Sequence, residues 1–183
     1  MVENFLKISD INGVLKIVVK IEQHLLLQNW KRLLWILLAI AICFAVGYTA
    51  RVFQADSLAE WYPLLEKPGL TPPDSVFPIA WGIIYVCMGI SIGLISNELG
   101  FRRNPLISLF VMQLALNFLW SISFFYMMNP MLGFINILLL DIVVLMYTFN
   151  ACKVNRLSAW LFLPYILWLA FATYLNGYIY MYN

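Results

Sequence analysis

The chain has 183 residues, of which 63% are hydrophobic and 11% are charged. A soluble domain of this size could not bury so much apolar surface, so the composition predicts a protein embedded in lipid. The net charge of +2 and the scattered basic residues argue against a nucleic-acid partner. Cys43, Cys87 and Cys152 lie far apart in apolar stretches, so we expect free thiols and no metal site.

Residues 1–30 form an amphipathic N-terminal extension. Lys16, Lys20 and Glu22 interrupt the apolar run and no small-residue cleavage site follows, which argues against a cleaved signal peptide. We expect a helix on the inner membrane surface, and a flexible tail is the alternative. His24 is the single histidine of the chain, and a role as a haem ligand is the weaker interpretation of it.

Residues 31–183 contain five apolar stretches, each close to the roughly 20 residues that a helix needs to cross a bilayer. These spans are Leu33–Ala50, Val76–Ile95, Pro105–Met128, Met131–Cys152 and Leu157–Tyr182. The longest connection, Arg51–Ser75, joins the first two spans. The predicted fold is an all-α integral membrane bundle of five transmembrane helices with a long loop between the first and second.

Basic residues mark one end of the spans. They are Lys31, Arg32, Arg102, Arg103, Lys153 and Arg156. The positive-inside rule then places the N-terminus inside, and the C-terminus and the long loop outside. Together with the uncleaved N-terminus, this favours a bacterial cytoplasmic membrane.

Polar residues inside the spans need a partner, a cavity or a ligand. Gln113 and Asn117 share one helix face with Trp120 and Phe124 in the third span. Hydrogen bonds between helices and a pocket wall both explain this face. Asp141, in the middle of the fourth span, is protonated, paired or open to a wet cavity.

Spacing also singles out residues in two other spans. In the fifth span Tyr165, Trp168, Ala172 and Leu175 lie on one helix face. In the second span, the G-x-x-x-G pair at 89 and 93 permits close helix contact, within the bundle or between the protomers of a homodimer.

Three blocks of sequence carry a resemblance to a known family. They are "WYPLLEKPGLTPP" followed by "VFPIAWGIIYVCMG", then "QLALNFLWSISFF", then "LPYILWLAFATYLN". In this order and spacing they resemble the translocator protein family, also called tryptophan-rich sensory proteins (TspO/MBR), over residues 33–183. The resemblance implies a five-helix membrane bundle, often dimeric, in which the first loop folds as a lid over a pocket among the helices.

The resemblance also implies a ligand and a set of contacts. Such proteins bind tetrapyrroles such as protoporphyrin IX, and no other cofactor is required. The implied ligand-binding residues are Trp81, Gln113, Asn117, Trp120, Tyr165, Trp168, Ala172 and Leu175. The implied lid residues are Trp61, Tyr62, Lys67, Pro68, Leu70, Pro72 and Pro73. Prolines fix φ, so a lid of this composition loses less entropy when a ligand binds.

Three functions follow from the resemblance. The first is a sensor or regulator that binds tetrapyrroles. The second is an enzyme that degrades protoporphyrin IX in light, with Trp81 and Trp168 as electron or radical partners. The third is a transporter of porphyrin or lipid, which lacks support because the sequence shows no inverted repeat.

The sequence departs from the family pattern at two places. Leu70 stands where the family usually has a tryptophan in the loop. The sterol motif that ends the fifth span in relatives closes on a basic residue, whereas Tyr178 is followed here by "IYMYN". We therefore do not expect cholesterol to be the natural ligand.

Overall fold

The computed structural model describes the backbone of residues 2–99 and 105–183 and the side chains of 13–96 and 105–183. Arg102 and Arg103, which contribute to the predicted orientation, lie outside the described residues. The chain divides into two compact units, Met1–Trp35 and Ile36–Asn183. Helix α1 contributes to both units, and each unit is described by itself.

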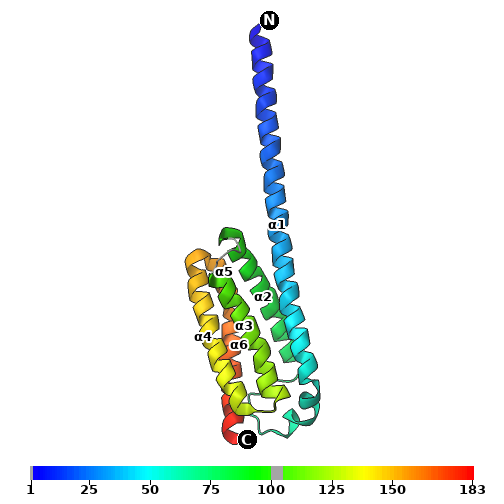
Figure 1. The fold of residues 1–183 in the computed structure, drawn as a ribbon, viewed down its shortest axis with the longest axis vertical. Coiled ribbons are helices and arrows are strands. Elements are labelled where there is room, and N and C mark those ends of the chain that lie inside the picture. Colours follow the sequence, from blue (N-terminus) through cyan, green and yellow to red (C-terminus); the bar gives the residue numbers. More distant parts are fainter. Residues whose placement is uncertain (1, 100–104) are drawn as a thin grey trace. The chain divides into compact units, whose positions relative to one another are not determined.

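The described residues are helical, with no strand among them. The helices are α1 (Val2–Glu60), α2 (Val76–Leu99), α3 (Pro105–Ser121), α4 (Pro130–Val154), α5 (Arg156–Trp160) and α6 (Leu163–Tyr182). Five stretches within the described residues are long and apolar enough to cross a membrane, which confirms the predicted fold class. In the larger unit α4 packs against α3, α5 and α6, and α2 packs against α3, α5 and α6. The α1–α2 connection and the end of α6 lie at the same end of this bundle (Figure 1).

Helix α1 continues past Ala50, the expected end of the first span, to Glu60. The segment 51–60 is rich in helix-forming residues and contains neither proline nor glycine, so nothing in it stops the helix. Pro63 then falls in a short 3-10 turn, Tyr62–Leu64. The true connection is therefore the shorter stretch 61–75.

The third and fifth spans are not continuous α-helices. After Ser121 the chain widens into a π-helical segment, Ile122–Tyr126, and Met128 then adopts a left-handed backbone with φ of 49°. The side chain of Asn129 caps α4 by accepting a hydrogen bond from the Leu132 amide at 3.0 Å. The fifth span breaks between α5 and α6, where Pro164 occupies the first turn of α6 and has no N–H to donate.

The G-x-x-x-G pair of α2 is used inside the chain. A Cβ at Gly89 would lie 2.7 Å from the backbone nitrogen of Ile40, and a Cβ at Gly93 would lie 3.1 Å from the Cα of Ile36. Both contacts are with α1, so the glycines let α1 and α2 approach closely within one bundle. This resolves the choice between the bundle and a second protomer for these two residues.

A buried group of hydroxyls joins α2, α4 and α5, and we call it the hydroxyl cluster: Ser91, Tyr147 and Ser158. The Ser91 hydroxyl lies 2.9 Å from the Tyr147 hydroxyl and 2.6 Å from the Ser158 hydroxyl. The Ser158 hydroxyl donates to the Ser91 carbonyl at 2.9 Å. All three side chains are fully buried, so each polar atom has its partner inside the protein.

Candidate functional site

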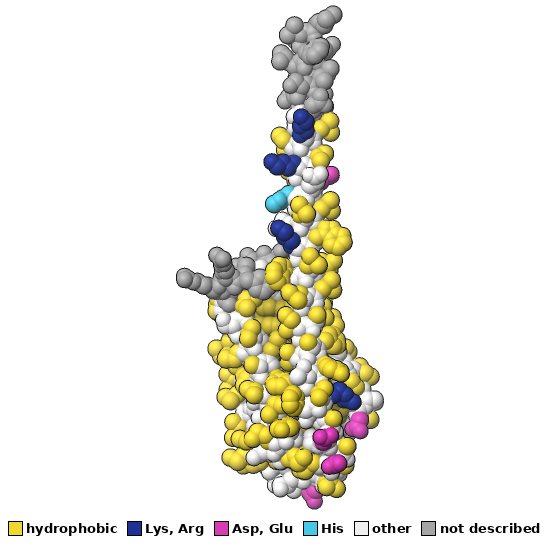
Figure 2. Space-filling model, turned by 45° about the vertical axis from the view of Figure 1, so that its right-hand side comes forward, with side chains coloured by type: hydrophobic (Ala, Val, Ile, Leu, Met, Phe, Trp, Pro, Cys, Tyr) yellow, Lys and Arg dark blue, Asp and Glu magenta, His cyan; other side chains and the backbone are white. Residues whose placement is uncertain are grey.

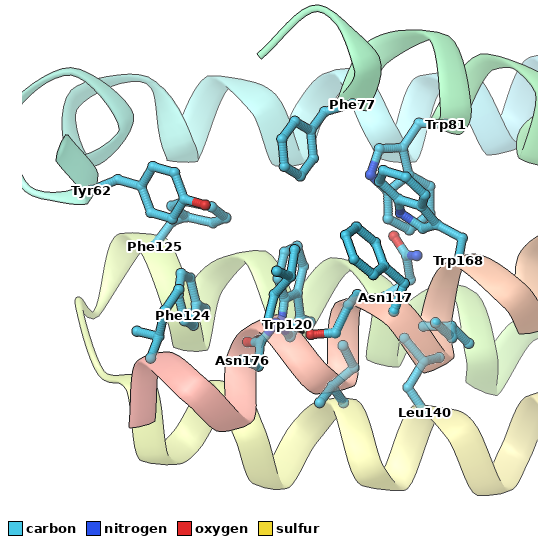
Figure 3. A pocket seen from close by; sticks show the side chains of 16 residues that line it. Tyr62, Phe77, Trp81, Asn117, Trp120, Phe124, Phe125, Leu140, Trp168 and Asn176 are labelled. Atoms are coloured by element: carbon cyan, nitrogen blue, oxygen red, sulfur yellow. Dashed lines mark hydrogen bonds between the residues drawn. The ribbon is translucent and has the colours of Figure 1, made fainter. Parts of the chain in front are cut away.

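A cavity opens among the helices of the larger unit. It encloses about 580 Å³ of space free of protein atoms, a volume that includes open solvent. Its lining residues are Tyr62, Phe77, Trp81, Asn117, Trp120, Phe124, Phe125, Ile137, Leu140, Trp168, Leu169, Phe171, Ala172, Leu175, Asn176 and Ile179. Tyr62, Phe124 and Phe125 lie at one end, and Trp81 and Trp168 lie at the other (Figure 3).

The two tryptophans at the end away from Tyr62 are held by other rings. Trp81 stacks on Tyr85 with centroids 5.3 Å apart and meets the ring of Tyr165 edge-on at 6.0 Å. Trp168 meets Phe77 edge-on at 5.7 Å. These neighbours limit the rotation of both indoles, so their faces and edges are presented to the cavity in a fixed arrangement.

The π-helical segment forms the wall nearest the loop. Trp120 stacks on Phe124 at 5.7 Å, and Phe124 meets Phe125 at 4.9 Å. Phe124 and Phe125 are consecutive in sequence, and both line the cavity. The wider turn of this segment brings two successive aromatic rings into one wall, and such segments are frequent at functional sites.

Two asparagines and one indole of the cavity lining form hydrogen bonds with neighbouring groups of the protein. The Asn117 amide nitrogen donates to the Tyr165 hydroxyl at 3.1 Å. The Trp120 indole nitrogen donates to the Asn176 amide oxygen at 3.0 Å, and the Asn176 nitrogen donates to the Ala172 carbonyl at 2.8 Å. The Asn117 amide oxygen has no partner among the described residues, so it remains available as an acceptor in an otherwise apolar site.

Tyr62 brings the loop to the cavity. Its ring packs on Phe125 at 5.6 Å, while the neighbouring Trp61 packs on Phe124 at 5.6 Å. Burial, with a smaller contribution from the negative charge of Asp74, raises the pKa of Tyr62 above its usual value. The Tyr62 hydroxyl therefore keeps its proton near neutral pH and can donate a hydrogen bond at the mouth.

Two contacts hold the loop in place. The Lys67 ammonium donates to the carbonyls of Tyr62 at 2.8 Å and Pro63 at 3.3 Å, and it lies 4.8 Å from the centre of the Tyr62 ring. The Asn183 side chain accepts from the Glu66 amide at 2.9 Å and donates to the Glu66 carbonyl at 3.1 Å. The second contact ties the loop to the end of α6.

The structure gathers most of the predicted ligand-binding residues at the cavity. Those that line it are Trp81, Asn117, Trp120, Trp168, Ala172 and Leu175. Gln113 and Tyr165 do not line it. Gln113 is fully buried with its amide nitrogen 3.9 Å from the Met88 sulfur, and Tyr165 lies behind Asn117 as its hydrogen-bond acceptor. The cavity lining therefore takes up only part of each predicted helix face.

Among the predicted lid residues, Tyr62 lines the cavity. The others are not among its lining residues: Trp61, Lys67, Pro68, Leu70, Pro72 and Pro73. The Leu70 side chain is 69% exposed, so the departure from the family pattern leaves an exposed side chain and not a filled contact at the mouth.

Sequence reasoning missed several lining residues. The aromatic ones are Phe77, Phe125 and Phe171, and the polar one is Asn176. Asn176 follows Ala172 by four residues and therefore shares its helix face, a spacing from which it could have been found. Phe125 could not have been found from α-helical spacing because the π-helical segment shifts the register.

Asp141 lies outside the cavity lining and has a partner. The Thr173 hydroxyl donates to the Asp141 carboxyl at 2.8 Å, which joins α4 to α6. Within the described side chains no three His, Cys, Asp or Glu residues come together as metal ligands.

The comparisons with known proteins agree on one family. The TspO/MBR family model matches residues 39–181. The chain is 39% identical to the tryptophan-rich protein TspO of Archaeoglobus fulgidus over 149 residues, covering 79% of this chain and 94% of that one. It is 35% identical to the TspO of Chlorobaculum tepidum over 149 residues, covering 80% and 94%. It is 36% identical to the human translocator protein over 137 residues, covering 73% and 79%.

Proposed function

We propose that this chain, which belongs to the TspO/MBR family of integral membrane proteins, binds a tetrapyrrole such as protoporphyrin IX in the aromatic cavity and acts as a sensor or regulator. The observation that carries the proposal is the convergence of Trp81, Trp120 and Trp168 with Asn117 on one cavity. Flat aromatic walls suit a flat macrocycle, and an unused amide acceptor suits the N–H groups at its centre.

The loop gives such a ligand a way to signal. Tyr62 belongs both to the cavity wall and to the loop, and Glu66 is tied to Asn183. A ligand that displaces the Tyr62 ring would move the loop on the outer surface of the bundle. A regulator needs this kind of difference between its bound and free states.

The test is a titration of the full chain in nanodiscs with protoporphyrin IX in the dark, followed by tryptophan quenching and porphyrin absorbance. We expect saturable binding that weakens about tenfold or more in Trp168→Leu and about tenfold in Asn117→Leu, which lose a stacking plane and an acceptor respectively. Trp160→Leu is the matched control, because Trp160 is 68% exposed and lies outside the cavity lining.

Two results would contradict the proposal. One is the absence of saturable binding by the unaltered chain. The other is an equal loss of affinity in Trp168→Leu and Trp160→Leu, which would assign the quenching to porphyrin dissolved in lipid rather than to the cavity.

Light-dependent degradation of the same ligand is the second candidate function, because Trp81 and Trp168 lie together at the same end of the cavity (Figure 3). In this reading the excited porphyrin is oxidised and dissolved oxygen is reduced, and an indole that gives up an electron regains one from the porphyrin. Illumination should then bleach the porphyrin faster with the protein than in empty nanodiscs. The double variant Trp81→Phe with Trp168→Phe should lose this difference, and an unchanged rate in that variant would exclude the tryptophans.

We also propose that the loop end of the bundle faces outward. The α4–α5 connection carries Lys153 and Arg156. The loop end carries Arg51 and Lys67, and the exposed acidic residues Asp56, Glu60, Glu66 and Asp74 gather there with them (Figure 2). A membrane-impermeant thiol reagent added to intact cells should label Leu70→Cys but not Cys152. The reverse pattern would invert the orientation.

A further inference from the structure

The N-terminal unit carries a feature that ligand binding does not use. The first membrane-compatible stretch, Gly13–Glu60, is 48 residues long, whereas one crossing of a bilayer needs roughly 20. The family match begins at residue 39, so the first part of this stretch lies outside the family core. The part of this helix that is not needed for the crossing must therefore lie outside the hydrocarbon core of the bilayer.

Basic residues gather on one side of this segment. At 100° per residue, Lys16, Lys20, His24 and Lys31 fall within a sector of about 80°. All four side chains are exposed. Figure 2 shows the basic side chains and the histidine along one edge of the segment and yellow side chains along the other.

Exposed apolar side chains lie all round this segment, including Leu27 within the basic sector, and five of them fall in the opposite sector. They are Leu15, Val18, Leu25, Leu26 and Leu33, with exposed fractions between 45% and 59%. Glu22 and Asn29 fall in the same sector, which disfavours deep burial in hydrocarbon. A helix with a cationic side and an interrupted apolar side fits the boundary between headgroups and acyl chains better than either water or the bilayer centre.

We propose that residues 13–32 bind the anionic headgroups of the membrane surface, as a chain-specific extension of the bundle. The charge complementarity is direct, since this segment holds Lys16, Lys20, Lys31 and Arg32 against the single acidic residue Glu22. Basic residues beside a membrane span are attracted to acidic lipid, and each one changes the partition by about fivefold. The next residues of the chain enter the lipid, so the segment is held at this surface at high local concentration.

The experiment uses the full chain with Cys87→Ser, Cys152→Ser and Val18→Cys, labelled with an environment-sensitive fluorophore. Cys43 is fully buried and stays in place. The protein is reconstituted at one chain per nanodisc, in phosphatidylcholine alone and in an equal mixture with phosphatidylglycerol. We expect blue-shifted emission, and quenching by spin-labelled lipid, in the anionic mixture but not in phosphatidylcholine.

Two variants with the same loss of charge sharpen the result. Lys16→Gln with Lys20→Gln should lower the ratio of lipid-bound to free segment by about 25-fold, and high salt should lower it too. Lys153→Gln with Arg156→Gln removes two positive charges from the α4–α5 connection and should leave the label unchanged.

Three outcomes would overturn the proposal. Equal label environments in both lipids would exclude headgroup charge as the determinant. Equal effects of the two double variants would assign the result to net charge and not to this segment. A blue shift that appears only when several chains share one nanodisc would make a second copy the partner.

Discussion

Two groups of polar side chains lie between the helices of the larger unit, and they use their hydrogen bonds differently. In the hydroxyl cluster, the hydroxyls of Ser91, Tyr147 and Ser158 bind one another, and none of the three residues lines the cavity described above. At the cavity, the Asn117 amide nitrogen donates a hydrogen bond to the Tyr165 hydroxyl, and the amide oxygen has no partner among the described residues. The first group is closed to other molecules, and the second keeps an acceptor for one.

The difference shows why a polar residue in a span does not by itself indicate a site. In lipid an unpaired polar atom is costly, so a saturated cluster stabilises the contact between helices. A polar atom left open beside aromatic walls gains its partner only when something binds. The two groups should therefore respond oppositely to substitution: one in stability, the other in affinity.

The largest expected effect is on the stability of the hydroxyl cluster. Tyr147→Ala should lower the free energy of unfolding by about 3–5 kcal/mol, because it leaves a cavity between the rings of Phe110 and Phe162. Thermal unfolding in lipid nanodiscs measures the change. Tyr48→Ala is the control, since Tyr48 is 73% exposed. An equal loss of unfolding free energy in Tyr48→Ala would show that the hydroxyl cluster does not stabilise the bundle more than an exposed tyrosine does.

Ser91→Ala should have the next largest effect, about 1–3 kcal/mol of unfolding free energy, because it leaves the buried Tyr147 hydroxyl short of a partner. Porphyrin affinity, measured at a temperature where the variant is folded, should stay the same. Thr49→Ala removes an exposed hydroxyl that bonds its own helix at 2.8 Å, and it should change neither quantity. A loss of affinity in Ser91→Ala would mean that the two groups are coupled.

A smaller effect is expected at the cavity mouth. The Lys67 ammonium uses two of its three donors on carbonyls, so one remains for a carboxylate of the porphyrin. Lys67→Gln should weaken the binding of protoporphyrin IX by about three- to fivefold, which corresponds to the free energy of an exposed ion pair. The dimethyl ester of the same porphyrin should bind both proteins equally, and an equal loss for both ligands would indicate a change in the loop instead.

The smallest expected effect is kinetic. Asn183→Ala removes two exposed hydrogen bonds to Glu66 and should speed porphyrin release about threefold, with little change in unfolding free energy. Stopped-flow displacement by excess unlabelled ligand measures the rate. Tyr182→Ala, at a position that is 57% exposed, is the neighbouring control. The same increase in the release rate in this variant would show that the effect does not come from the contact between Asn183 and the loop.

The sequence predicted the number of spans because each is an apolar run longer than a soluble helix requires. The helix faces of Asn117 and Trp168 were also predictable, since helical spacing alone places them. The ends of elements were less accessible. Helix α1 runs on to Glu60 because nothing stops it, and the break before α6 depends on how Pro164 is accommodated.

The depth of a residue within the bundle could not be predicted from one helix. Gln113 and Asn117 share a face, yet Gln113 packs against Met88 and Asn117 reaches the cavity. Whether a residue of α3 reaches the cavity depends on its neighbours on α2 and α6, and the spacing along one helix does not reveal those neighbours. Asn176 differs, because its spacing from Ala172 already places it on the lining face, where it accepts a hydrogen bond from the Trp120 indole.

The contact between Asn183 and Glu66 has a practical consequence for handling the protein. A purification tag or fluorescent fusion attached directly after Asn183 would begin beside the loop whose Tyr62 forms part of the cavity wall. Such a fusion would compete with the two hydrogen bonds and alter the rates that report on ligand entry. Preparations for binding kinetics should therefore release any C-terminal fusion by proteolysis before measurement.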